Sequence, residues 1–155
     1  MEEFTKSLEQ KENQENGKIT RPNLLALFLI LSMVNGVLSS ISNLMIYGMV
    51  DAFREVFAEQ DVMKVMGVEI DLSLFLNTDK NFFLFQGVLY LLSFSGALLM
   101  WNYKKIGFHF YTLSQILLLI VVKVYLPDLP FPLLDFITTA FFVMVYAKNL
   151  SLMRK

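Results

Sequence analysis

Cysteine is absent from the sequence, and histidine occurs once, at His109. Without cysteine, the chain can form no disulfide, no thiolate metal site and no thiol-based redox centre. A single histidine excludes a bis-histidine haem site and a metal site built from several histidines within this chain. We therefore expect neither a metal nor another cofactor.

The sequence also lacks the short motifs that mark several enzyme classes. It contains no His-Glu-x-x-His for intramembrane metalloproteolysis and no glycine-rich loop for phosphate or a dinucleotide. Its 13 basic and 14 acidic side chains nearly cancel, so the net charge gives no general attraction to nucleic acid. These absences favour a non-enzymatic protein with no nucleic-acid partner.

Long hydrophobic segments dominate what is present. Hydrophobic residues make up 55% of the 155 residues, and the mean hydropathy is +0.54. About 20 consecutive apolar residues suffice for a helix to cross a hydrocarbon core. We predict an all-α integral membrane protein, a bundle of four transmembrane helices at about 23–50, 82–101, 106–126 and 131–148. The first of these is far longer than a signal core of roughly 7 to 15 residues, so we expect it to be retained.

The polar segments divide the rest of the chain. Residues 1–21 are rich in Glu, Gln, Asn and Lys and bury too little apolar surface to fold alone, which predicts a mobile tail or a docking arm. Residues 22–155 are expected to form a single membrane domain. In the connection 51–80, apolar residues recur at near-helical spacing among charges, which predicts an amphipathic helix that lies on the membrane or continues the first span. A second apolar patch, 72–76, follows Asp71, a candidate N-cap.

The distribution of basic residues predicts the orientation, because Lys and Arg are retained on the cytoplasmic face. Nine basic residues fall on the side of the two termini: Lys6, Lys11, Lys18, Arg21, Lys104, Lys105, Lys148, Arg154 and Lys155. Three fall in the 51–80 connection, together with seven acids: Arg54, Lys64 and Lys80, with Asp51, Glu55, Glu59, Asp61, Glu69, Asp71 and Asp79. We predict cytoplasmic termini and an external, acidic 51–80 cap.

Two ionisable residues lie within the predicted spans, Lys123 and Asp135. Each is about six residues from the turn between the last two spans, so both are expected at one depth and facing each other. A charge at the bilayer centre costs roughly 2.5 to 3.5 kcal/mol, so such residues often mark function, here a proton or ion relay or a ligand contact. The alternatives are a structural ion pair, a Lys123 that snorkels to the outer interface, or a Lys123 paired with Asp128.

Amide side chains within the spans form a second group of candidates. Asn35, Gln86 and Gln115 would line a polar path if they converge on one cavity. The alternative is packing, because amides bond across helix interfaces and small residues let helices approach closely. On that ground, Asn35-Gly36 and the stretch 93–97 are predicted packing seams.

The link between the second and third predicted spans concentrates aromatic and basic side chains. Trp and Tyr favour the headgroup level, and adjacent lysines reach lipid phosphates. We predict an interfacial belt that contacts lipid or a partner, formed by Trp101, Tyr103, Lys104, Lys105 and His109.

This link also carries a resemblance to other proteins. The box Gly96-Ala97-Leu98-Leu99-Met100-Trp101, followed by Lys104-Lys105-Ile106-Gly107-Phe108 and Tyr111, resembles a segment of uncharacterised small four-helix membrane proteins of bacteria. The resemblance covers the second and third predicted spans. It implies a four-helix fold and a location in the bacterial inner membrane, and it carries no activity.

Three functional hypotheses follow from these features. The first is an accessory or interaction subunit of an inner-membrane assembly, because 15 Phe and 9 Met provide adaptable surfaces for other subunits, for self-association and for lipid. The second is a small transporter or ligand-binding membrane protein with Lys123 and Asp135 as its charged centre. A membrane enzyme is the third.

Overall fold

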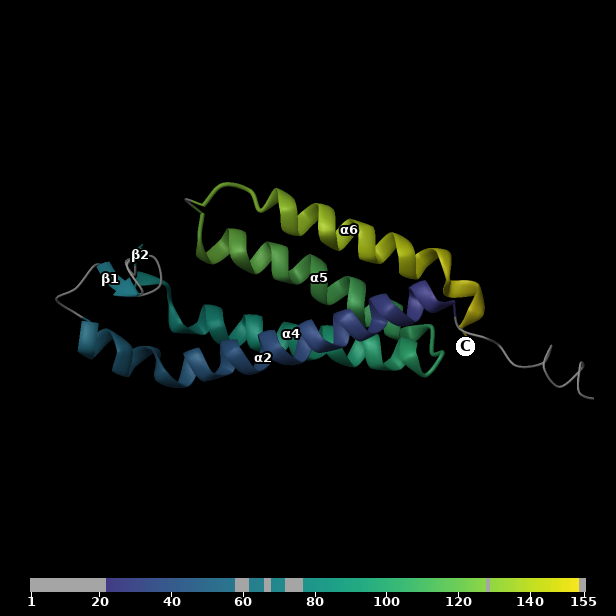
Figure 1. Ribbon diagram of the computed structural model, residues 1–155, viewed down its shortest axis with the longest axis horizontal. Coiled ribbons are helices and arrows are strands. Elements are labelled where there is room, and N and C mark those ends of the chain that lie inside the picture. The colour runs from purple at the N-terminus through teal and green to yellow at the C-terminus, as the bar shows by residue number, and fades with distance from the viewer. Residues whose placement is uncertain (1–21, 58–61, 66–67, 72–76, 128, 154–155) are drawn as a thin grey trace, which may run out of the picture.

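The computed structural model describes residues 22–57, 62–65, 68–71, 77–127 and 129–153 (Figure 1). Four α-helices make up most of this part, α2 (Asn23–Phe57), α4 (Lys80–Trp101), α5 (Ile106–Tyr125) and α6 (Leu133–Lys148). Two strands, β1 (Val62–Val65) and β2 (Val68–Asp71), lie between α2 and α4, and a 3-10 helix, η1 (Leu150–Leu152), follows α6. The predicted tail 1–21 and the apolar patch 72–76 lie outside the described residues.

Within the described residues, three helices, α2, α4 and α5, are long and apolar enough to cross a membrane. The prediction of a helical membrane protein is confirmed to this extent. Helix α6 has 16 residues. At a rise of about 1.5 Å per residue it is roughly 24 Å long, less than the ~30 Å of a typical hydrocarbon core.

Helix α2 packs along α4, and α4 packs along α5, whereas α6 lies beside α5 and meets α2 near one end (Figure 1). Glycines permit the closest of these approaches. A Cβ on Gly96 of α4 would lie 2.6 Å from the backbone nitrogen of Tyr111, and one on Gly107 of α5 would lie 2.5 Å from the carbonyl oxygen of Gly96. A Cβ on Gly36 of α2 would lie 3.0 Å from Phe94 Cβ. Small residues therefore set how closely α2, α4 and α5 pack.

Two hydrophobic clusters hold the helices at opposite ends. The tyrosine core lies where α2 begins and α6 ends, and consists of Leu25, Leu29, Ala97, Met100, Tyr111, Tyr146 and Met153. The phenylalanine core lies toward the strands and consists of Val50, Phe82 and Phe83. The tyrosine core joins all four helices, whereas the phenylalanine core receives residues from α2 and α4 and packs against α5.

The connection between α2 and α4 departs from the predicted amphipathic helix. Helix α2 continues the first span as far as Phe57, but β1 and β2 then form an antiparallel hairpin in which Val62 pairs with Asp71 and Val65 with Val68. The prediction of a helix is wrong for residues 62–65. Val62, Val65, Val68 and Ile70 are β-branched, and such side chains favour strands over helices.

Charged residues join the ends of α2 and α4 beside this hairpin. Asp51, beyond the predicted first span, forms ion pairs with Arg54 at 3.3 Å and with Lys80 at 2.9 Å. The hydrogen bond from Lys80 lowers the pKa of the exposed Asp51 carboxyl group. The Asp79 side chain accepts a hydrogen bond from the backbone N–H of Asn81 at 2.8 Å and so caps α4.

Candidate functional site

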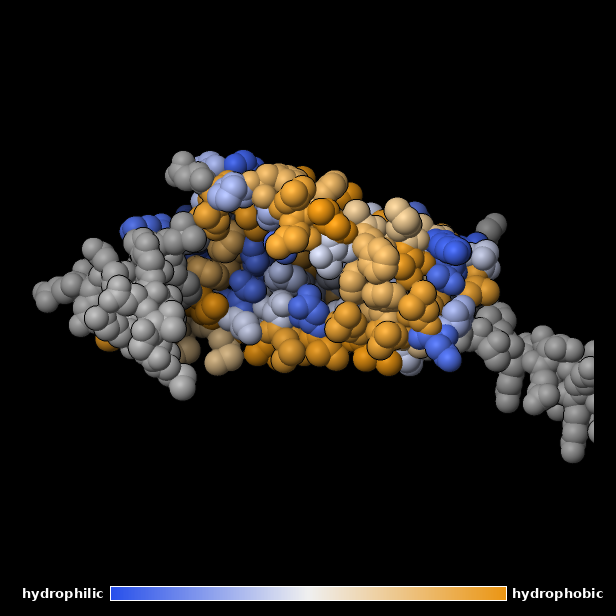
Figure 2. Space-filling model, turned by 45° about the horizontal axis from the view of Figure 1, so that its top comes forward, coloured by the Kyte–Doolittle hydropathy of each residue, from blue (hydrophilic) through white to orange (hydrophobic). Residues whose placement is uncertain are grey.

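A cavity of about 440 Å³ lies between α2, α4, α5 and α6, in the part of the molecule between the tyrosine core and the phenylalanine core. Figure 2 shows a hollow of hydrophilic residues enclosed by hydrophobic surface. The lining residues are Leu31, Ser32, Asn35, Gln86, Tyr90, Ser93, Tyr111, Gln115, Leu118, Leu119, Val122, Pro132, Asp135, Thr138, Thr139 and Phe142. The three amides singled out from the sequence, Asn35, Gln86 and Gln115, all lie on this cavity.

Helical spacing gathers the polar residues at the cavity. Gln86, Tyr90 and Ser93 are separated by four and three residues on α4, so they share one face of that helix. Tyr111 and Gln115 of α5 are four residues apart and share a face in the same way. Sequence reasoning left Tyr90 out of the candidate site. Its position four residues after Gln86 is the signal that would have included it.

One chain of hydrogen bonds crosses the cavity wall. The amide nitrogen Nε2 of Gln115 donates to Ser93 Oγ at 2.9 Å, and Thr139 Oγ1 donates to Gln115 Oε1 at 3.3 Å. These bonds join α5 to α4 on one side and to α6 on the other. Both ends of the Gln115 amide therefore have protein partners, and its role in the wall is structural.

A second network closes the cavity toward the tyrosine core. Ser32 Oγ lies 2.6 Å from Tyr146 Oη and donates to Tyr111 Oη at 3.3 Å, while Tyr146 Oη donates to the carbonyl oxygen of Phe28 at 2.8 Å. The rings of Tyr111 and Tyr146 meet edge to face at 5.0 Å. Ser32, Tyr111 and Tyr146 are all buried, so this end of the cavity is sealed.

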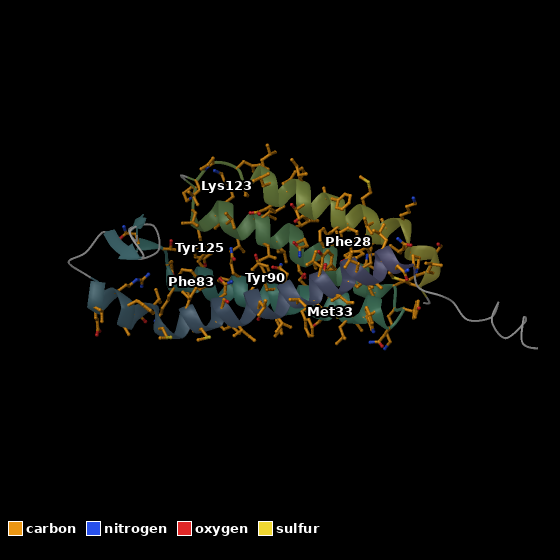
Figure 3. The ribbon with its side chains drawn as sticks, in the orientation of Figure 1. Phe28, Met33, Phe83, Tyr90, Lys123 and Tyr125 are labelled. Carbon is orange, nitrogen blue, oxygen red and sulfur yellow. The ribbon has the colours of Figure 1, made fainter. Side chains whose placement is uncertain are left out.

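The cavity also contains polar side chains without a protein partner. Gln86, Tyr90, Asp135 and Thr138 make no side-chain hydrogen bond to the described part of the chain. Asp135 is the third residue of α6 and is exposed, and Tyr90 of α4 is half-buried on the same cavity. Figure 3 shows Tyr90 in the middle of the molecule. These groups are free to bind a ligand or water.

The structure does not join Lys123 and Asp135 as a pair. Lys123 Nζ donates to the carbonyl oxygens of Pro127 at 2.7 Å and Leu129 at 3.1 Å, at the end of α5 (Figure 3). No ion pair joins these two residues, both of which the structure describes. The last turn of a helix leaves carbonyl oxygens unpaired, and a nearby lysine can bind carbonyls there and just beyond. The alternative partner Asp128 lies outside the described residues.

The predicted interfacial belt lies around the turn from α4 to α5. Lys104 and His109 are exposed, and Trp101, Tyr103 and Lys105 are partly buried. Tyr103 has a φ of 58°, and the amides of Tyr103 and Lys104 bond to the carbonyls of Met100 and Leu99. This pattern is a Schellman motif, which ends α4 and turns the chain into α5. Contact of the belt with lipid or a partner stays a prediction.

Comparison with protein-family models, curated proteins and solved structures gave no match for this chain. The resemblance to small bacterial four-helix proteins therefore stays an expectation. The cavity itself is therefore the basis for a functional proposal.

Proposed function

We propose that this protein is a ligand-binding membrane protein whose binding site is the cavity between the four helices. The observation that carries the proposal is a group of unpartnered polar side chains within otherwise apolar helices. A volume of about 440 Å³ suits a small organic molecule, because ligand sites typically measure about 300 to 1,000 Å³. The proposal keeps the transporter or ligand-binding hypothesis and replaces the Lys123–Asp135 centre with Asp135 alone.

Packing between helices does not explain why unpartnered polar side chains line the cavity. Polar side chains that hold transmembrane helices together bond to one another, as Gln115 does with Ser93 and Thr139. Gln86, Tyr90 and Asp135 have no such bonds in the described chain. Gln86 and Tyr90 are half-buried, and Asp135 is exposed. Within a membrane, a polar group without a partner costs free energy, so a ligand or water that bonds to these side chains stabilises the helices around them.

A cavity-filling substitution tests this proposal. Thr138 lines the cavity, whereas its neighbour Ile137 on α6 does not and is 54% exposed. We expect Thr138→Trp to fill the cavity and abolish ligand-induced thermal stabilisation of the purified protein, and Ile137→Trp to leave it intact. The measurement is a thermal-unfolding screen with small amphipathic compounds. If the compounds stabilised Thr138→Trp and Ile137→Trp equally, the result would contradict the proposal.

The proposal includes the orientation of the helices in the membrane. We place four spans in the bacterial inner membrane with both termini in the cytoplasm, supported by the nine basic residues on the side of the termini. Helix α2 begins, and α6 ends, at the end of the molecule that carries the α4–α5 turn (Figure 1). Since the natural chain has no cysteine, single-cysteine variants report cleanly. A membrane-impermeant thiol reagent is expected to label Asp79→Cys in intact cells but not Lys105→Cys.

One observation favours the second candidate function, an accessory subunit of a membrane assembly. Helix α6 has fewer contacts with the other helices than α2, α4 and α5 have with one another, and Leu134 near its start is 80% exposed. A helix of another subunit could pack against this surface in place of lipid. A photo-crosslinking residue at Leu134 would then yield one discrete protein adduct in cells, whereas lipid adducts alone would count against a subunit role.

A further inference from the structure

In the part of the chain that the structure describes, the cavity has one charged group, and the sign of that charge restricts the ligand. We infer that the cavity binds an amphipathic organic cation, with Asp135 holding the positive group. This inference rests on the proposed function and adds the chemical class of the ligand.

The charges around the cavity favour a cation over an anion. Among the described residues, Asp135 is the only charged one that lines the cavity, and no described lysine or arginine lines it. The neighbouring cation, Lys123, donates to two backbone carbonyls at the end of α5. A carboxylate within the span of a membrane protein is costly without a counter-charge. A bound cation supplies that counter-charge, whereas a bound anion would add repulsion.

The surroundings of Asp135 fit a positive group larger than a metal ion. No group of three or more potential metal-binding side chains occurs in the described part of the chain. Tyr90 and Asp135 both line the cavity, Tyr90 from α4 and Asp135 from α6. A cavity that offers a carboxylate and an aromatic ring attracts alkylammonium groups through both charge and the ring quadrupole.

The other walls fit the hydrocarbon part of the ligand. Leu118, Leu119 and Phe142 line the cavity together with the polar side chains. These apolar residues come from α5 and α6, so a ligand with its ammonium group at Asp135 places its apolar body against them. Amphipathic organic cations combine these two features.

Asp135 has an alternative role, in which it stabilises α6 and does not bind a cation. Asp135 is in the first turn of α6, and Pro132, the N-cap residue, gives no side-chain hydrogen bond to the helix. A carboxylate in the first turn stabilises a helix by its interaction with the helix dipole. On this account, Asp135→Asn weakens the fold but leaves the charge preference of the cavity unchanged.

Binding of three compounds of similar shape tests the inference: benzyltrimethylammonium, its uncharged carbon isostere neopentylbenzene, and the anion benzylsulfonate. The full chain is placed in nanodiscs, and equilibrium dialysis against empty nanodiscs corrects for partition into lipid. We expect the cation to bind at least about tenfold more tightly than the neutral isostere, and the anion most weakly, as charge complementarity requires. Asp135→Asn should reduce this preference to about one while the neutral compound binds as before.

The controls separate the inference from the proposed function. Asp51→Asn removes an equal charge outside the cavity and should leave the preference unchanged. If Asp135→Asn does not fold, Tyr90→Leu provides the second variant, and it should weaken the cation several-fold more than the neutral compound. Equal binding of cation and neutral compound to the natural chain would overturn this inference alone. Absence of binding by all three compounds would overturn the proposed function as well.

Discussion

The tyrosine core and the cavity beside it use the same kinds of side chain in different ways. At the tyrosine core, the hydroxyl of Ser32 lies within hydrogen-bonding distance of both the Tyr111 and the Tyr146 hydroxyls, where α2, α5 and α6 converge. Toward the strands, Gln86, Tyr90 and Asp135 have no hydrogen-bond partner in the described chain. Polar residues thus connect helices where the backbones converge, and they line a cavity where α6 diverges from α2.

This comparison predicts that the stability of the region where the helices converge depends most on the close contact between helix backbones. A leucine at Gly96 would drive a side chain into the backbone of α5, where a Cβ alone already lies 2.6 Å from Tyr111 nitrogen. We expect Gly96→Leu to cost about 3 kcal/mol or more of stability. Gly48 is the matched control, because a Cβ there meets nothing within 4 Å. SDS-induced unfolding in mixed micelles measures both variants, and equal stability would mean that the α4–α5 contact is looser than described.

The next effect concerns the hydroxyl of Tyr146. Tyr146→Phe removes its bond to the Phe28 carbonyl and its contact with Ser32, both near the buried junction of α2 and α6. We expect a loss of about 2 kcal/mol, since two hydrogen bonds of about 1 kcal/mol each are lost while Ser32 keeps its bond to Tyr111. Tyr125→Phe provides the control, because the Tyr125 hydroxyl makes no hydrogen bond to the described chain. If both variants unfold at the same SDS fraction, the tyrosine network does not hold α6.

A smaller effect separates two glutamines that face the same cavity. Gln115 bonds to Ser93 and Thr139, whereas Gln86 has no partner in the described chain. We expect Gln115→Leu to cost about 1 kcal/mol, because it removes two hydrogen bonds between transmembrane helices at about 0.5 kcal/mol each. Gln86→Leu should leave the stability of the empty protein unchanged or raise it, and should weaken ligand binding. If Gln86→Leu destabilised the protein more than Gln115→Leu, the assignment of Gln115 to the cavity wall and of Gln86 to ligand contact would be wrong.

The sequence predicted the helices better than it predicted the site. The start of the first span at Asn23 and the end of the second at Trp101 agree with the structure, because apolar composition changes to polar at both places. The hairpin was missed because apolar residues at 53, 56, 57, 63 and 66 also satisfy a helical spacing. The cavity was suggested by three amides, but its existence depends on the direction of α6, which no local pattern encodes.

The charged centre illustrates the same limit. Because Lys123 and Asp135 are about equally far in sequence from the turn between the last two spans, the sequence predicted the same depth in the membrane for both. In the structure, both lie near the α5–α6 connection. Which partner Lys123 binds depends on the free carbonyls of Pro127 and Leu129, whose positions follow from the path of the turn. Residue spacing predicts which groups share a face or a level, whereas hydrogen-bond partners require the backbone.

The smallest predicted effect compares two adjacent threonines of α6. Thr139 Oγ1 donates to Gln115 at 3.3 Å, whereas Thr138 lines the cavity and makes no side-chain hydrogen bond to the described chain. We expect Thr139→Val to cost about 0.5 kcal/mol, near the average for a hydrogen bond between transmembrane helices. Thr138→Val should leave SDS unfolding unchanged, because the substitution removes no protein contact. A larger loss at Thr138 than at Thr139 would mean that the cavity side of α6 bonds to another helix, and the cavity would then be a closed interface.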